Sequence, residues 1–204
     1  MLAGKNLPNI LTVSRIFTVL IFVAIASVAH TNYIADKEIV LILRFIAVIL
    51  ALLAGLTDLL DGYLARKFHW VSDFGALMDP LADKIFVTGT MLMAVEYRLI
   101  PAWIAIMVLF REFMVTGLRT LAAKNQVVIS ADRWGKLKTA LQMTMLGIAG
   151  IAWAIDGGTK YLREASPFGI RIWYIWFAFM VGIVLVTLFS GLGYFIRYRK
   201  MLKN

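Results

Sequence analysis

Cysteine is missing from this chain, and charged residues are scarce. The 204 residues contain no cysteine and only 16% charged side chains, whereas a typical soluble domain has about 25%. The lack of cysteine excludes disulfide bonds and thiolate metal sites. The low charge content argues against a soluble globular protein and indicates a chain that lies within a membrane.

Apolar residues dominate the sequence instead. They make up 61% of the sequence, and the mean hydropathy is +0.82. A membrane-spanning helix needs about 20 predominantly apolar residues, and six segments qualify. We therefore expect an all-α polytopic membrane protein with six transmembrane helices, forming a single integral-membrane domain over residues 1–204. The helices are expected at about Leu7–Ala29, Ile39–Lys67, Ser72–Val95, Pro101–Lys124, Arg133–Ile155 and Phe168–Arg199.

Two features of these segments concern processing and orientation. The first segment has a signal peptide as its alternative, but Arg15 lies inside it and further spans follow. With six spans, thirteen basic residues fall on the side of the termini and six on the other. Because positive charge is retained in the cytoplasm, we expect both termini there. The net charge of +9 then reflects contact with anionic lipid rather than nucleic acid, since no basic surface carries interleaved aromatics.

Four carboxylates lie within 26 residues, at the predicted cytoplasmic ends of the second and third helices. Asp58 and Asp61 are three residues apart, and Asp79 and Asp83 are four apart. On a helix, each spacing places both side chains on one face. Four acids brought together near a bilayer repel one another. Hard divalent cations such as Mg²⁺ or Mn²⁺ prefer oxygen ligands and would stabilise the cluster.

Small residues and one arginine accompany these acids. Gly62, Ala65 and Gly75 leave room for a ligand to approach the backbone, and Arg66 suits phosphate oxygens. Together with the acids they suggest metal ions that hold a diphosphate, with one acid accepting a proton from an attacking hydroxyl. Taken singly, an acid could instead be a helix cap or part of an ion path, so a cation channel or transporter is an alternative.

The full spacing, D-x2-D-G-x2-A-R-x8-G-x3-D-x3-D, resembles the signature of the CDP-alcohol phosphotransferase family at every fixed position from Asp58 to Asp83. The resemblance implies a six-helix membrane enzyme, usually a homodimer, that transfers a phosphatidyl group from a CDP-linked lipid to an alcohol and releases CMP. It implies that two divalent cations bind the acids, with Asp83 also acting as general base. The implied metal ligands are Asp58, Asp61, Asp79 and Asp83, and the implied contacts to CDP-diacylglycerol are Gly62, Ala65, Arg66 and Gly75.

Basic residues in the fourth and fifth segments give information about the acceptor alcohol. Arg111 and Arg119 are eight residues apart and share a helix face, and Glu112 could orient one of them. Lys136 and Lys138 form a second basic cluster at the same predicted surface. Two such clusters could bind an acceptor that carries its own phosphate. The alternative for the lysines is ordinary anchoring at the membrane surface.

Two motifs and the opening residues Asn6–Arg15 resemble the bacterial phosphatidylglycerophosphate synthases within that family. The motifs are Arg-Glu-x4-Gly-Leu-Arg from residue 111 and Gly-Lys-x-Lys-Thr from residue 135. This resemblance implies sn-glycerol 3-phosphate as acceptor, CDP-diacylglycerol as donor and an active site on the cytoplasmic side of the cell inner membrane. Sister enzymes that use inositol phosphate, serine or phosphatidylglycerol are the alternative. The implied phosphate contacts are Arg111, Arg119, Lys136 and Lys138, and the implied nucleotide contacts are Asn9, Thr12 and Arg15.

Asp73 and the last predicted segment stand outside this pattern. Asp73 adds a fifth acid where the family resemblance leads us to expect Asn or Thr, and an N-cap for the third helix is its expected role. The last segment carries no motif of its own.

Overall fold

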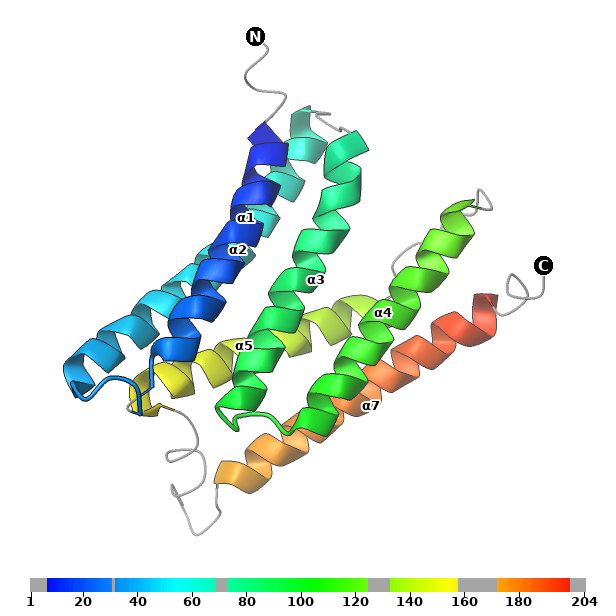
Figure 1. Ribbon diagram of the computed structural model, residues 1–204. Coiled ribbons are helices and arrows are strands. Elements are labelled where there is room, and N and C mark those ends of the chain that lie inside the picture. Colours follow the sequence, from blue (N-terminus) through cyan, green and yellow to red (C-terminus); the bar gives the residue numbers. More distant parts are fainter. Residues whose placement is uncertain (1–6, 31, 69–72, 125–132, 158–171, 199–204) are drawn as a thin grey trace. The chain divides into compact units, whose positions relative to one another are not determined.

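The computed structural model describes residues 7–30, 32–68, 73–124, 133–157 and 172–198, which form helices and short connections without a strand (Figure 1). The all-α prediction is confirmed for these residues. The described ends agree with the predicted ends within a few residues, because each apolar run is bounded by charged or turn-forming residues. The helices are α1 (Leu7–Val28), α2 (Lys37–Phe68), α3 (Asp73–Glu96), α4 (Ala102–Lys124), α5 (Arg133–Asp156) and α7 (Ile172–Tyr198).

Four of the described helices, α1, α2, α5 and α7, are long and apolar enough to cross a membrane. The apolar stretches are Asn9–Val28, Lys37–Thr57, Arg133–Ile155 and Ile172–Ile196. Helices α3 and α4 carry the charges on which the predicted site depends, which lowers their apolarity. The count of six spans therefore stays a prediction, while a membrane protein with several apolar helices is what the sequence led us to expect.

The chain separates into two compact units. The first comprises Met1–Glu96 with Trp153–Gly157, and the second comprises Tyr97–Ala152 with Gly158–Asn204. Helices α1, α2 and α3 thus belong to the first unit, and α4, α7 and most of α5 belong to the second. A single domain over residues 1–204 stays a prediction.

Short local signals fix two helix ends. Asp36 caps α2, because its Oδ1 accepts hydrogen bonds from the backbone N–H groups of Glu38 (2.8 Å) and Ile39 (3.4 Å). At the end of α5, Gly157 has a φ of 75° and its N–H donates to the carbonyl of Trp153 at 2.7 Å. Glycine adopts this left-handed conformation without steric cost, so it is a suitable residue at the end of this helix.

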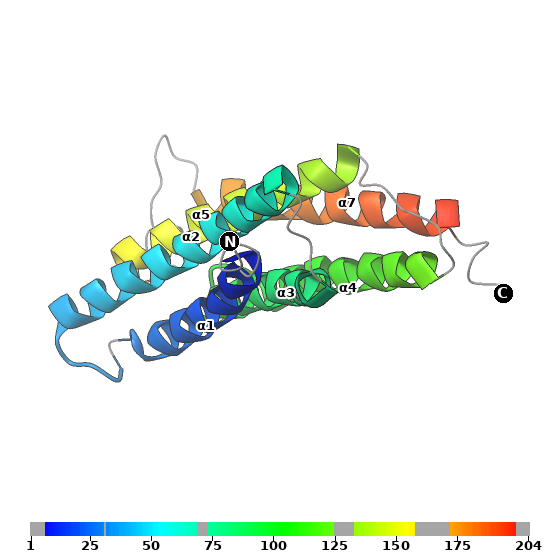
Figure 2. The same cartoon turned by 90° about the horizontal axis from the view of Figure 1, so that it is seen from above.

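In the first unit, α1 packs against both α2 and α3 (Figures 1 and 2). Gly89 makes the α1–α3 approach close, since a Cβ atom there would lie 3.2 Å from Val23 and 3.3 Å from Val19. Small residues at such crossings let membrane helices approach closely. Near the end of both helices, the Ser27 hydroxyl lies 3.9 Å from the sulfur of Met93, so α1 and α3 run in the same direction.

Helix α2 runs antiparallel to α1. The Nε of Arg44, two turns into α2, donates a hydrogen bond of 3.2 Å to the carbonyl of Ala29, just after α1 ends. Within the first unit, α2 therefore runs opposite to α1 and α3, as expected for a chain that threads back and forth across a membrane. This arrangement returns the end of α2 and the start of α3 to the same end as the start of α1.

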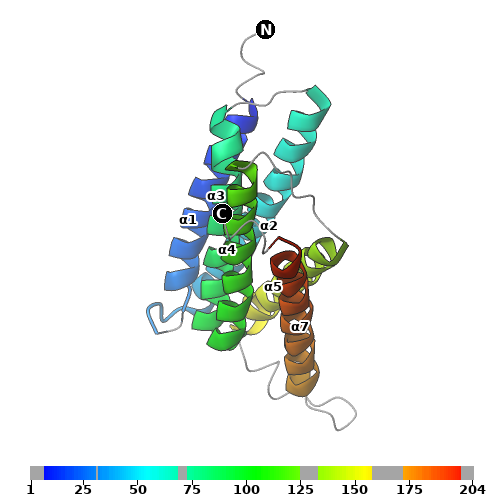
Figure 3. The ribbon, with the colours of Figure 1, turned by 90° about the vertical axis from the view of Figure 1, so that its right-hand side faces the viewer.

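In the second unit, α4 packs against α7 (Figure 3). The buried indole N–H of Trp176 donates to the carbonyl of Leu99 at 2.9 Å, and the rings of Trp103 and Phe177 meet edge to face at 6.3 Å. These contacts join the beginnings of the two helices. The two helices run in the same direction, so residues near the end of α4 meet residues near the end of α7.

Candidate active site

The first part of the predicted site lies at the end of α2. Asp58, Asp61, Gly62, Ala65 and Arg66 are all helical residues of α2. Their side chains lie outside the described part of the chain. Because the helix continues without a break over Lys37–Phe68, the spacing of the two acids keeps them on one helix face.

The second pair of acids lies near the start of α3. Asp79 and Asp83 are one turn apart and both are exposed, and Gly75 lies one turn before them and is buried. Pro80 lies inside the helix directly after Asp79. Proline lacks the N–H of a helical hydrogen bond, so one backbone carbonyl in the preceding turn loses its usual partner. The two carboxylates are carried on one accessible face of α3, beside this proline.

Helix α1 reaches this pair of acids through a threonine. The Thr12 hydroxyl donates a hydrogen bond of 2.7 Å to Oδ1 of Asp79, and the Thr12 side chain is buried. Arg15, one turn further along α1, is buried as well. The sequence assigned Thr12 to the nucleotide and Asp79 to a metal, and the structure brings the two side chains into direct contact.

The donor set of this region suits a hard divalent cation. Among the described side chains it offers the carboxylate oxygens of Asp79 and Asp83, and one oxygen of Asp79 is already oriented by a hydroxyl. No three Asp, Glu, His or Cys side chains form a metal-binding group among the side chains that are described, and Asp58 and Asp61 are not among these. The two-metal cluster therefore stays a prediction that the present donors fit.

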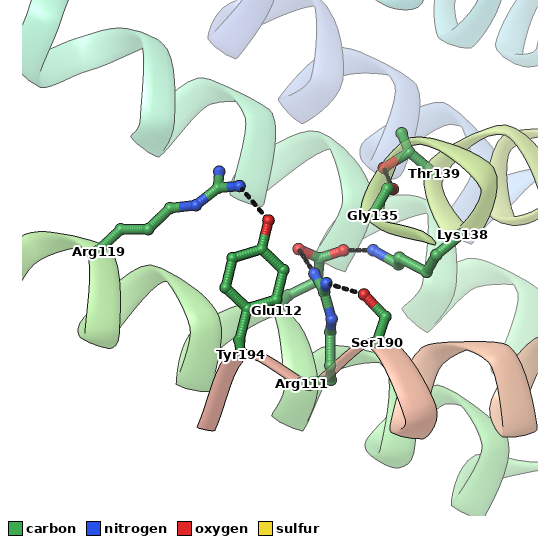
Figure 4. A network of polar contacts seen from close by, with 8 residues as sticks. All are labelled: Arg111, Glu112, Arg119, Gly135, Lys138, Thr139, Ser190 and Tyr194. Carbon is green, nitrogen blue, oxygen red and sulfur yellow. Dashed lines mark hydrogen bonds and ion pairs between the residues drawn. The ribbon is translucent and has the colours of Figure 1, made fainter. Parts of the chain in front are cut away.

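A network of charged side chains lies in the second unit, and we call Arg111, Glu112, Arg119 and Lys138 the cationic network (Figure 4). Arg111 and Lys138 are 6% and 1% exposed, although arginine and lysine are almost never buried unless paired. The Lys138 ammonium pairs with one oxygen of Glu112, and the Arg111 guanidinium lies 3.9 Å from the other. Glu112 thus holds cations from two helices, α4 and α5, as the sequence suggested for one arginine.

Helix α7 supplies further partners of the two arginines. Arg111 Nη2 donates to the Ser190 hydroxyl at 2.7 Å, and Arg119 Nη2 donates to the Tyr194 hydroxyl at 3.1 Å. The guanidinium carbons of Arg111 and Arg119 also lie 5.7 Å and 5.5 Å from the centre of the Tyr194 ring. Both distances are within the range of a cation–π contact. The predicted shared face of Arg111 and Arg119 is consistent with their common partner.

The two predicted lysines differ in environment. Lys138 is buried in the cationic network, whereas Lys136 is exposed. Residues two apart on a helix point about 200° away from each other, so one site on α5 can take only one of them. Within the described network, Lys136 makes no contact with the other members. Its role at the acceptor stays a prediction.

Comparison with known proteins supports the family resemblance. The model of the CDP-alcohol phosphatidyltransferase family matches residues 5–184, a stretch that includes α1 to α5 and both candidate clusters. The chain belongs to this family. The family resemblance drawn from the spacing between Asp58 and Asp83 is thereby confirmed.

Several relatives of the chain have similar lengths and share one name. A Bacillus subtilis protein is 39% identical over 98% of both chains. A Mycoplasma pneumoniae protein is 33% identical over 98% of this chain and 89% of its own, and a Rickettsia typhi protein is 34% identical over 94% and 96%. Each is named CDP-diacylglycerol–glycerol-3-phosphate 3-phosphatidyltransferase.

Sequence reasoning missed Ser190 and Tyr194, because the last helix carries no motif. A weaker signal was present. Ser190 and Tyr194 are four residues apart, with Thr187 three before Ser190, so their polar groups form one stripe along a very apolar helix. Polar stripes within membrane helices usually face protein rather than lipid. The stripe indicates a buried polar surface, but it does not say which helix lies opposite.

Proposed function

We propose that this chain transfers the phosphatidyl group of CDP-diacylglycerol to sn-glycerol 3-phosphate and releases CMP. Membership of the family supports the reaction class. The names of relatives that align over nearly their whole length support the substrates. The structural observation that carries the choice of acceptor is the convergence of Arg111, Arg119 and Lys138 in one network. Glu112 supplies one negative charge among these three cations, and a phosphate group would balance the remaining positive charge.

The proposed reaction begins with CDP-diacylglycerol, whose acyl chains lie in the bilayer. Asp83, exposed on α3, takes the proton from the primary hydroxyl of sn-glycerol 3-phosphate. The resulting oxygen forms a bond to the lipid-side phosphorus, and the bond from that phosphorus to CMP breaks. CMP leaves with the electron pair of that bond, and phosphatidylglycerophosphate stays in the membrane.

The remaining residues bind and orient the two substrates. Arg111, Arg119 and Lys138 bind the phosphate of the acceptor. Lys136, which is exposed, is a further candidate for the same role. Gly62, Ala65, Arg66 and Gly75 contact the CDP group, with Asn9 and Thr12 at its edge. Two divalent cations, Mg²⁺ or Mn²⁺, would be held by Asp58, Asp61, Asp79 and Asp83 and would neutralise the diphosphate charge.

The proposal extends to the place and assembly of the enzyme. The surplus of basic residues on the side of the termini supports an inner-membrane protein with its termini and active site in the cytoplasm. A homodimer is proposed from the family resemblance.

An acceptor panel tests the proposal. Purified protein in lipid nanodiscs receives labelled CDP-diacylglycerol with Mg²⁺ or Mn²⁺ and one acceptor at a time: sn-glycerol 3-phosphate, inositol phosphate, serine or phosphatidylglycerol. We expect CMP release and a labelled lipid product with sn-glycerol 3-phosphate alone. CMP release with another alcohol only would overturn the acceptor assignment, and ion flux without CMP release would favour the transporter.

A further inference from the structure

Three residues of α7 lie against the arginines of α4. The side chains of Ser190 and Tyr194 are 1% and 4% exposed, and each accepts a hydrogen bond from a different arginine. Gly191 lies between them and is buried too. We call Ser190, Gly191 and Tyr194 the α7 platform (Figure 4 shows Ser190 and Tyr194 beside the arginines).

Gly191 lets the stem of Arg111 lie close against α7. A Cβ atom at Gly191 would lie 3.0 Å from Cγ of Arg111 and 3.3 Å from Cε of Met114. The stem of Arg111 therefore crosses α7 directly over the glycine. Gly193, two residues further along the same helix, has nothing within 4 Å of such an atom. Of these two glycines, Gly191 is therefore the one that lies in tight contact with the arginine.

The chemistry of the platform differs from that of an ordinary ion pair. A serine hydroxyl, a phenol oxygen and an aromatic face all hold a guanidinium group without cancelling its charge. A carboxylate in the same place would compete with an anionic ligand. The platform therefore orients Arg111 and Arg119 without adding negative charge to that of Glu112, whose carboxylate lies 3.9 Å from Arg111.

Orientation before binding affects affinity. A free arginine side chain has about 2 kcal/mol of rotamer entropy to lose. When the protein fixes the side chain in advance, ligand binding no longer carries that cost. Since α4 and α7 run parallel and meet at Arg111 and Arg119, α7 is placed to fix both.

We propose that the α7 platform positions Arg111 and Arg119 and thereby sets the affinity for the phosphate of the acceptor. This inference rests on the proposed function and adds a third helix to the acceptor site. The platform acts through the arginines, so its residues are positioning residues. Their loss should raise the Michaelis constant for the phosphorylated acceptor and leave that for CDP-diacylglycerol little changed.

Steady-state kinetics with paired variants test the platform. Gly191→Ala is compared with Gly193→Ala, and Tyr194→Phe and Ser190→Ala remove one hydroxyl each without filling space. We expect Gly191→Ala to raise the KM for sn-glycerol 3-phosphate about tenfold, and each hydroxyl variant about three- to tenfold, with Gly193→Ala unchanged. The KM for CDP-diacylglycerol should stay within about twofold in all four variants.

Several outcomes would overturn the platform. One is an equal rise in the KM for sn-glycerol 3-phosphate and the KM for CDP-diacylglycerol. Another is the same KM for sn-glycerol 3-phosphate in Gly191→Ala and Gly193→Ala. If Gly191→Ala does not fold, Tyr194→Phe and Ser190→Ala decide, and unchanged acceptor KM values in both would refute the proposal.

A direct binding measurement separates this inference from the proposed function. Calorimetric titration of the wild type and the variants with inorganic phosphate does not depend on turnover. Weaker phosphate binding in Gly191→Ala and Tyr194→Phe supports the platform even if sn-glycerol 3-phosphate proves not to be the acceptor. Unchanged phosphate binding in both variants contradicts the platform, whatever the acceptor is.

Discussion

Thr12 on α1 and Asp79 on α3 are joined by a hydrogen bond of 2.7 Å from the threonine hydroxyl to Oδ1 of the carboxylate. The threonine is buried, and the carboxylate is exposed. The hydroxyl thus holds one oxygen of Asp79 from the protein side. A metal ligand held in this way keeps its orientation when no cation is bound.

Replacing Thr12 by valine should therefore weaken metal binding. Valine keeps the shape and removes the hydrogen bond, so Asp79 loses its fixed orientation. We expect the apparent affinity for Mg²⁺ or Mn²⁺ to fall about tenfold or more, since partners of metal ligands typically contribute that much. The measurement is the metal concentration needed for half-maximal CMP release, together with the rise in melting temperature that the metal causes.

Two further variants make the Thr12 experiment specific. Thr12→Ser keeps the hydroxyl and should restore most of the affinity. Thr18→Val removes a hydroxyl that bonds within α1, to the carbonyl of Ser14 at 2.9 Å, and should leave the metal titration unchanged. Identical titrations for wild type and Thr12→Val would show that this contact has no part in metal binding.

Asp83→Asn tests the predicted general base. Asparagine retains an oxygen that can face a cation but cannot accept the proton of the attacking hydroxyl. We expect CMP release to fall about 100-fold or more, as is usual when a general base is lost. CDP-diacylglycerol binding, followed by the melting temperature at saturating lipid, should persist.

Asp36→Asn is the matched control for Asp83→Asn. Asp36 is exposed and caps α2 through its side chain. Asparagine caps helices as well as aspartate does, so this variant should fold and turn over like the wild type. If Asp83→Asn retained near-normal activity in the same assay, the base would have to be sought elsewhere.

A double-mutant cycle tests the pair of Glu112 and Lys138. Either Glu112→Gln or Lys138→Met removes one member of the pair from a largely buried position. Each should lower the free energy of unfolding by about 1–3 kcal/mol. The double variant should be less destabilised than the sum of the two, because contacting residues are not additive. Unfolding by denaturing detergent provides the measurement.

Lys136→Met supplies the comparison for that cycle. Lys136 is exposed on α5, and surface substitutions usually change stability by no more than about 0.5 kcal/mol. Simple additivity of the Glu112 and Lys138 variants would mean that the two side chains do not interact in the folded protein.

Gly89→Ala tests the packing of α1 on α3. The added methyl would press on Val19 and Val23 at 3.3 Å and 3.2 Å. We expect a loss of about 1–3 kcal/mol in unfolding free energy, the usual effect of overpacking. Gly117→Ala on α4 is the control, because nothing lies within 4 Å of its new methyl and alanine favours the helix by up to about 1 kcal/mol. A stable Gly89→Ala variant would mean that α1 and α3 move apart easily.

The sequence determined the helices and the reaction class. Apolar runs bounded by charges place a helix wherever a membrane span can form, and turn residues such as Gly157 mark where one ends. The spacing of Asp58, Asp61, Asp79 and Asp83 identified the family, since fixed intervals on a helix fix which side chains share a face. Both inferences depend only on neighbours along the chain.

The tertiary structure decided which faces meet. It joined Thr12 to Asp79 and buried Lys138 rather than Lys136. It also placed Ser190 and Tyr194, on a helix without a motif, against the arginines of α4. Helical periodicity shows which residues of one helix point the same way, but not which helix lies opposite. That choice depends on close packing between segments far apart in sequence, as at Gly191 and Arg111, and so becomes visible only in three dimensions.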